Sequence, residues 1–216
     1  MKLLNSLGPN PRIVRMFALE KGVDLEFEDV DLLGGENRQE AYLTKNPSGQ
    51  LPTLVLDDGT CISEVTAICE YLEDTQASPS LVGSTPEQRA ETRMWTRKVD
   101  LNIAEPMANG FRFSEGLELF KDRLHVIPQA ADDLKATAQE WLAKLDGWME
   151  GQQFICSDRF TMADVFLFGM VDFFASIGQP IDPSHTNVVA WYERVGARPS
   201  AEKSLHAMAG AAGMRG

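Results

Sequence analysis

The chain has 216 residues, of which 44% are hydrophobic and 24% are charged. This composition is typical of a globular protein, and the length fits one large domain or two small ones. Acidic residues outnumber basic residues by 32 to 20, for a net charge of −12, which argues against nucleic acid as a partner. No apolar run reaches membrane-spanning length and the first residues lack the apolar stretch of a secretion signal, so we expect a cytoplasmic protein without a membrane partner.

Three cysteines, Cys61, Cys69 and Cys156, are distributed along the chain. Their number is odd, no CxxC motif is present, and no Cys/His spacing suits zinc. We therefore interpret them as small buried hydrophobic residues and expect no metal site.

The first 76 residues alternate between strand and helix patterns. A helix separates the first two predicted strands, which should therefore be parallel, whereas a tight turn at residues 57–59 should make the last two antiparallel. A mixed four-stranded sheet with helices on both faces is the thioredoxin-like arrangement. The predicted strands are residues 2–6, 23–32, 53–56 and 60–62, and the predicted helices are residues 11–21, a short segment within 34–46, and residues 64–74.

The rest of the chain carries helical patterns, so the predicted fold class is α/β followed by all-α. Residues 77–86 are rich in Ser, Pro and Gly and are typical of a linker. We predict that residues 87–208 form an all-helical domain and that residues 209–216 are a flexible tail. Thr161 and Asp164 have the spacing of a capping box before a nearly all-apolar helix, which should be the buried centre of this domain.

Four stretches of the chain resemble the glutathione S-transferase superfamily, in order and at the right spacing. Each is modestly specific, but together they cover nearly the whole chain. The resemblance implies a thioredoxin-like domain that binds glutathione, followed by a helical domain. The stretches are "NPSGQLPTL" at residues 46–54, "SEVTAICEYL" at 63–72, "FTMADV" at 160–165 and "VVAWYERVGARPS" at 188–200.

The resemblance implies that the peptide bond between Leu51 and Pro52 is cis, which exposes the backbone N–H and C=O of Leu51. The cysteinyl backbone of glutathione would pair there as an extra strand, and Gln50 would contact its other arms. The alternative is that Pro52 merely begins an edge strand.

Glu64 begins the next predicted helix, and the resemblance implies that it pairs with the ammonium of the γ-glutamyl end. The free N–H groups of the helix start would hold the neighbouring carboxylate. The alternative is that Glu64 only complements the helix dipole. The family usually has Ser or Thr after this Glu. Val65 retains a backbone N–H but offers no hydroxyl, and Thr66 is the candidate substitute.

Arg38 and Lys45 are in or near the segment that meets the glycine carboxylate of glutathione in relatives. Arg12, on the first turn of the first helix, is a weaker candidate for the same role. The alternative for each residue is a solvated surface charge.

The turn before the first helix is where superfamily members stabilise the glutathione thiolate. Asn10 falls where beta-class relatives have a cysteine and nu-class relatives an asparagine, and an amide NH2 can donate to a sulfur anion. Ser6 is the second candidate, and the backbone N–H groups alone are the third. The alternative for Asn10 is an N-cap, with Pro11 at the first helical position.

Four apolar residues could line an electrophile pocket, which relatives build between their two domains. The alternative is that they are ordinary core residues. They are Ile103, Met107, Phe111 and Phe113.

Together these features predict a glutathione S-transferase that conjugates glutathione, its co-substrate, to a small hydrophobic electrophile. The resemblance implies a homodimer, as in most of the family, and no cofactor. One alternative is a glutathione-dependent peroxidase or disulfide reductase, as among nu-class relatives. Another is a non-catalytic binding module of the same fold, which Val65 in place of Ser or Thr would favour.

Overall fold

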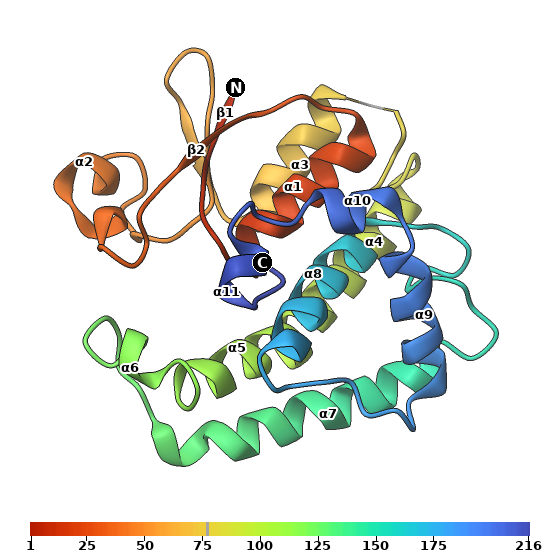
Figure 1. Ribbon diagram of the computed structural model, residues 1–216. Coiled ribbons are helices and arrows are strands. Elements are labelled where there is room, and N and C mark those ends of the chain that lie inside the picture. The colour runs from red at the N-terminus through yellow and green to blue at the C-terminus, as the bar shows by residue number, and fades with distance from the viewer. Residues whose placement is uncertain (77) are drawn as a thin grey trace. The chain divides into compact units, whose positions relative to one another are not determined.

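The computed structural model describes residues 1–76 and 78–216, and the chain forms two compact units (Figure 1). The first unit contains Met1–Leu81 together with Pro199–Gly216, and the second contains Val82–Arg198. Residue 77 of the predicted linker lies outside the described residues.

The last residues of the chain differ from the prediction, which assigned residues 87–208 to the helical domain and left 209–216 as a flexible tail. Residues 199–216 belong to the first unit, and residues 209–216 include a short helix, α11 (Ala209–Ala212). Buried arginines of the first helix hold this segment through its backbone carbonyls, a long-range contact that no local pattern reveals.

The first unit has the predicted mixed sheet, with strand order β2-β1-β3-β4. The first two strands are parallel and the other two pairings are antiparallel, which confirms the thioredoxin-like arrangement. The strands are β1 (Lys2–Asn5), β2 (Glu26–Asp29), β3 (Thr53–Val55) and β4 (Cys61–Ser63).

The successive residues Leu3 and Leu4 of β1 point to opposite faces of the sheet and are both buried, as a central strand requires. Leu4 packs with Val30 and Tyr42 on one face. The helices α1 and α3 pack against each other, and α10 packs on α1. The helical segments of this unit are α1 (Pro9–Lys21), η1 (Glu36–Arg38), α2 (Glu40–Leu43), α3 (Val65–Thr75), α10 (Pro199–Lys203) and α11.

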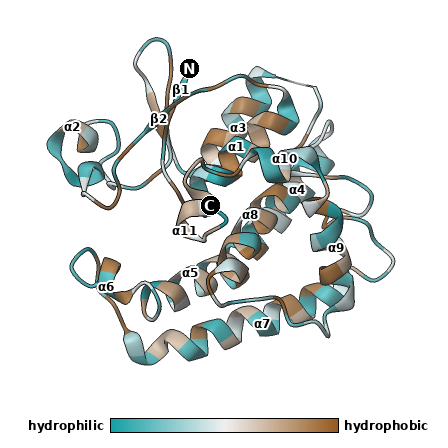
Figure 2. Cartoon of the chain, in the orientation of Figure 1, coloured by the Kyte–Doolittle hydropathy of each residue, from teal (hydrophilic) through white to brown (hydrophobic). Residues whose placement is uncertain are grey.

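The second unit is helical, as predicted, and Figure 2 shows hydrophilic and hydrophobic residues alternating along α7. None of the helices in the described ranges has both the length and the apolar character that a membrane crossing requires. The segments are α4 (Pro86–Val99), the π-helical η2 (Asp100–Ala104), α5 (Glu105–Arg112), α6 (Leu117–Phe120), η3 (Pro128–Ala130), α7 (Ala131–Trp148), α8 (Met162–Ser176) and α9 (Thr186–Gly196).

Helix α8 is the centre of the second unit, because every residue from Met162 to Phe174 is buried. Its first turn has the predicted capping box. Thr161 Oγ1 accepts from the N–H of Ala163, and Asp164 Oδ2 accepts from the N–H of Thr161 at 2.8 Å. The other oxygen of Asp164 accepts from the indole N–H of Trp191 at 2.9 Å, so the cap also ties α8 to α9.

Candidate functional site

The sheet brings three predicted segments to one of its ends. Leu4 of β1 pairs with Thr53 of β3, and Thr53 pairs with Ser63 of β4. Because β3 is antiparallel to both neighbours, the end of β1, the start of β3 and the end of β4 lie at the same end of the sheet. The turn into α1, the loop before β3 and the start of α3 are therefore neighbours.

The loop before β3 contains the predicted cis peptide bond between Leu51 and Pro52. Within residues 1–76 and 78–216, neither the N–H nor the C=O of Leu51 makes a hydrogen bond. Gln50 is exposed beside it. An unpaired backbone next to a sheet can accept an extended peptide as a further strand.

Two buried side chains fix this loop, and the sequence did not single them out. The hydroxyl of Tyr42 donates to the carbonyl of Gln50 at 2.5 Å, and the amide of Asn46 donates to the same carbonyl at 2.8 Å. Both side chains also contact the hydroxyl of Thr53, at 2.9 and 3.1 Å. Burial raises the pKa of Tyr42, so its phenol stays protonated and can donate. Asn46 lies within the stretch at residues 46–54 that resembles the family, whereas Tyr42 lies outside all four such stretches, so no sequence pattern indicated its role.

The start of α3 is shaped by Glu64, the N-cap residue, which has φ 71° and ψ 125°. A positive φ is strained for a non-glycine residue and is frequent at ligand sites. Glu64 is exposed, and no side chain caps the helix, so the first N–H groups of α3 have neither an intrahelical partner nor a side-chain partner. Val65 is buried, which explains an apolar residue there, and Thr66 is half-buried.

The turn into α1 differs from the predicted N-cap. The helix begins at Pro9, two residues earlier than expected, and Gly8 at φ 147° is the N-cap. Pro11 then occupies the third helical position, where it has no N–H for a cap to satisfy. Asn10 lies inside the first turn, half-buried, so its interpretation as the cap was wrong. Its amide makes no hydrogen bond with the rest of the described chain.

Ser6 is buried below this turn, at 5% exposure. Its hydroxyl lies 3.5 Å from the carbonyl of Leu7, and its own carbonyl accepts from Arg15 at 3.4 Å. The hydroxyl is therefore less accessible than the Asn10 amide.

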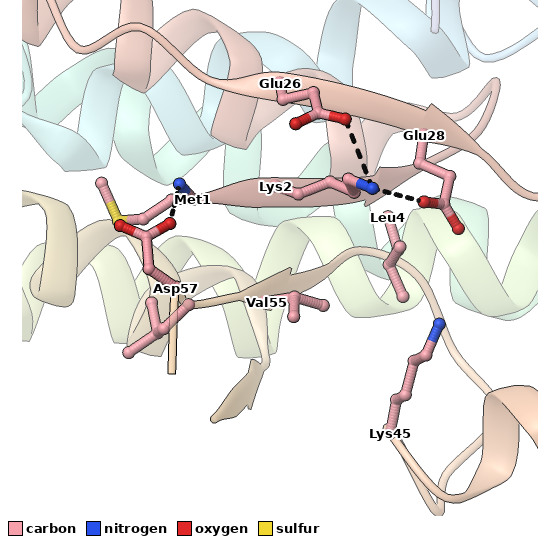
Figure 3. A pocket seen from close by; sticks show the side chains of 9 residues that line it. Met1, Lys2, Leu4, Glu26, Glu28, Lys45, Val55 and Asp57 are labelled. Carbon is pink, nitrogen blue, oxygen red and sulfur yellow. Dashed lines mark hydrogen bonds and ion pairs between the residues drawn. The ribbon is translucent and has the colours of Figure 1, made fainter. Parts of the chain in front are cut away.

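The structure places the three basic candidates in different surroundings. The exposed Arg38 folds back toward Gly35. Lys45 lines a pocket of about 250 Å³ and points toward Leu4 (Figure 3). Arg12 is fully buried and bonds to residues 201, 204 and 215.

The pocket beside Lys45 lies toward the start of β1, away from the cis-proline loop. Lys2 in this pocket bonds to Glu28 at 2.9 Å and to Glu26 at 3.3 Å, and these hydrogen bonds raise the pKa of Lys2 (Figure 3). The carboxylates of Glu26, Glu28 and Asp57 balance the three ammonium groups of the pocket, so the pocket has no surplus positive charge to attract an anion.

The predicted electrophile residues lie in the second unit. Ile103, Met107 and Phe113 are buried, at 2%, 0% and 8% exposure. Phe111 is half-buried and meets the ring of Phe173 edge-on at 6.2 Å. Phe111 is thus the most accessible of the four.

Two of the three cysteines are buried as predicted, whereas Cys61 is only partly buried, because it lies on the edge strand β4. All three cysteines are unpaired, and burial raises the pKa of Cys69 and Cys156, which keeps both as thiols. Among the residues the structure describes, no group of three or more His, Cys, Asp or Glu side chains is placed to hold a metal ion.

The first unit is thus a thioredoxin-like domain in which a cis-proline loop and an uncapped helix start lie at one end of the sheet. Comparison with known proteins identifies the group. Residues 8–75 match the N-terminal domain model of glutathione S-transferases, and residues 118–199 match the C-terminal domain model. The chain belongs to the glutathione S-transferase family.

Individual relatives cover nearly all of the chain. Glutathione S-transferase 2 of Saccharomyces cerevisiae is 30% identical over 205 residues, which are 92% of this chain and 86% of the relative. The crystal structure of a glutathione S-transferase domain-containing protein from Marinobacter aquaeolei has a TM-score of 0.87 and 34% identity, covering 93% of this chain and 99% of that one. Gtt2 from Saccharomyces cerevisiae has a TM-score of 0.85 and 28% identity, covering 95% and 100%.

Proposed function

We propose that this glutathione transferase conjugates glutathione to small hydrophobic electrophiles and uses an asparagine-type turn, as in nu-class relatives. The observation that carries the proposal is the unpaired backbone of Leu51, which lies at the same end of the sheet as Asn10 and Glu64. In one bound glutathione molecule, Leu51 would pair with the cysteinyl backbone, Asn10 would face the sulfur, and Glu64 would bind the γ-glutamyl end.

The γ-glutamyl end would bind at the start of α3. The carboxylate of Glu64 pairs with the ligand ammonium, while the uncapped N–H groups of Val65 and Thr66 donate to the ligand carboxylate. The strained backbone of Glu64 supports this role, because strain at a helix start is retained where it presents groups to a ligand. Gln50 is exposed beside the loop and reaches the same end.

The sulfur would lie at the turn into α1. A free thiol has a pKa of about 8.5, and lowering it by two units requires roughly 2.7 kcal/mol of preferential thiolate stabilisation. Pro9 and Pro11 remove two of the first three backbone N–H donors of α1. The backbone alone is therefore a weak donor, and the unused amide of Asn10 is the stronger candidate.

Titration of enzyme-bound glutathione by thiolate absorbance tests this assignment. We expect Asn10→Ala to raise the pKa of the bound thiol by about one unit, and Asn10→Asp to raise it further by adding a negative charge. Ser6→Ala should leave this pKa close to the wild-type value. The assignment to Asn10 is wrong if Asn10→Ala has a wild-type thiol pKa.

Comparing turnover of a chloro-nitroaromatic compound with turnover of a hydroperoxide tests the reaction class. Conjugation requires only thiolate attack, so the nitroaromatic should be turned over whether or not the protein reduces peroxides. A protein that turns over only the hydroperoxide would instead be a glutathione-dependent peroxidase.

We further propose a cytoplasmic homodimer. Met94 and Leu101 are 45% and 48% exposed and lie seven residues apart on one helical run, so they share a face that a second copy would cover. Three unpaired cysteines fit a reducing compartment. Sedimentation should give a dimer for the wild-type protein and a monomer for the double variant Met94→Glu/Leu101→Glu.

A further inference from the structure

The last residues of the chain lie against the turn that carries Asn10. A Cβ atom added at Gly216 would lie 2.6 Å from the nitrogen of Gly8 and 2.8 Å from its Cα. Gly216 is buried, and its carbonyl accepts from the N–H of His206 at 2.8 Å. Only a glycine fits this approach, because any side chain would displace the backbone of Gly8.

Two buried arginines of α1 hold the same segment. Arg12 donates to the carbonyl of Arg215 at 2.6 Å and to the carbonyl of Ala201 at 2.9 Å. Arg15 donates to the carbonyl of Ser204 at 2.7 Å. A guanidinium presents several donors in a rigid fork, so each arginine fixes the position of the backbone that it contacts.

Arg15 also reaches the other side of the turn. It donates to the carbonyl of Ser6 at 3.4 Å and to the side chain of Asn5, at the end of β1. The turn is thus held from both directions. Arg15 fixes the chain before it, Arg12 lies immediately after it, and Gly216 packs on Gly8 within it.

We propose that residues 204–216 position the sulfur-binding turn of the glutathione site, with Gly216 and Arg12 as positioning residues. This inference rests on the proposed function, because it assumes that the turn faces the sulfur. Gly8 has φ 147° and no side chain, so its backbone has wide conformational freedom. The contact with Gly216 removes that freedom and keeps the Asn10 amide aimed at one place.

Gly216→Ala is the direct test, since the added methyl group forces Gly8 and residue 216 apart. Gly210→Ala is the matched control, because Gly210 lies in the same segment, in α11, and a Cβ atom there has nothing within 4 Å. We expect Gly216→Ala to lower kcat/KM by about tenfold and to raise the pKa of the bound thiol by about one unit. Gly210→Ala should match the wild-type protein in both.

Arg12→Lys is the second variant, since an ammonium group cannot reproduce the fork between two carbonyls. It should shift the thiol pKa in the same direction as Gly216→Ala. A wild-type thiol pKa in Gly216→Ala overturns the inference, even if Arg12→Lys is impaired. If the wild-type protein itself forms no bound thiolate, the proposed function fails instead, so the two failures are distinguishable.

Discussion

At the scale of single residues, Tyr42 is a positioning group for the cis-proline loop. Its hydroxyl donates to the carbonyl of Gln50, the residue before the unpaired backbone of Leu51. We expect Tyr42→Phe to raise KM for glutathione several-fold with a smaller change in kcat, because in the proposed complex the loop contacts the cysteinyl backbone and not the sulfur. Loss of the hydroxyl should also lower the free energy of unfolding by about 1–2 kcal/mol.

Tyr71→Phe is the control for this prediction. Tyr71 is half-buried on α3, and its hydroxyl makes no hydrogen bond in the described part of the chain. Steady-state kinetics with varied glutathione and a fixed electrophile provide the measurement. Equal KM values for Tyr42→Phe and the wild-type protein would show that Asn46 alone suffices to hold the loop.

Residues inside sequence motifs could be predicted, and residues defined by long-range contacts could not. The cis bond before Pro52 followed from the family motif, as did the place of Glu64 at a helix start. The role of Asn10 as a cap was wrong because a Pro-Asn-Pro run allows two helix starts, and only the structure shows that Pro9 takes the first position. The approach of Gly216 to Gly8 joins opposite ends of the chain and leaves no local signal.

At the scale of elements, the cap of α8 gives the second unit a specific pH dependence. Burial raises the pKa of Asp164 to about 6, although several hydrogen-bond donors oppose the shift. An unfolded Asp has a pKa of about 3.9, so the folded state binds the extra proton between these values. The stabilisation from protonated Asp164 is therefore complete below about pH 4 and is lost as the pH rises through about 6.

Comparison with Asp164→Asn isolates this contribution, because the variant does not titrate at this position. The difference in unfolding free energy between the wild-type protein and the variant should decrease by about 2–3 kcal/mol from pH 4 to pH 7. Denaturation monitored by tryptophan fluorescence is the suitable measurement, since all four tryptophans belong to the second unit. A pH-independent difference would mean that the folded pKa is not raised.

The first unit contains a buried ion pair that joins three elements. Lys21, at the end of α1, lies 2.7 Å from Glu73 of α3, and their side chains are 0% and 3% exposed. Glu73 also accepts from the hydroxyl of Ser80 at 2.8 Å and from the N–H of Leu81 at 3.1 Å. The pair therefore connects α1, α3 and the segment at Ser80 and Leu81.

Removing one partner of this pair should be more damaging than removing both. Glu73→Gln leaves the Lys21 ammonium buried without a compensating charge, and we expect a loss of about 3–5 kcal/mol. The double variant Lys21→Met/Glu73→Gln should recover part of this loss. A double-mutant cycle by chemical denaturation measures the coupling, and simple additivity would show that the pair contributes no net interaction.

Element types were predictable where the hydrophobic pattern was strong, and less so where tertiary packing intervened. The apolar run and the capping box of α8 predicted the centre of the second unit, and the burial of this helix confirms the prediction. No pattern indicated the π-helical turn η2, which lies just before Pro106 in the first turn of α5. A wider turn accommodates the missing N–H and the bulk of the proline ring without breaking the helical run.

At the scale of the whole molecule, the net charge of −12 opposes the binding of glutathione. Glutathione has two carboxylates and one ammonium, so it is an anion at neutral pH, and its thiolate form carries a further negative charge. The long-range field of an acidic protein repels such a ligand and raises the pKa of its thiol. The contacts proposed at the start of α3 and at Asn10 act at short range, where salt screens them much less.

Added salt should therefore assist this enzyme. We expect kcat/KM for glutathione, measured with an uncharged electrophile, to rise roughly two- to threefold between about 10 mM and 150 mM salt. The pKa of the bound thiol should fall over the same range, because screening removes repulsion from the thiolate. A fall in kcat/KM with salt would instead mean that exposed cations such as Arg38 attract the ligand more strongly than the net charge repels it.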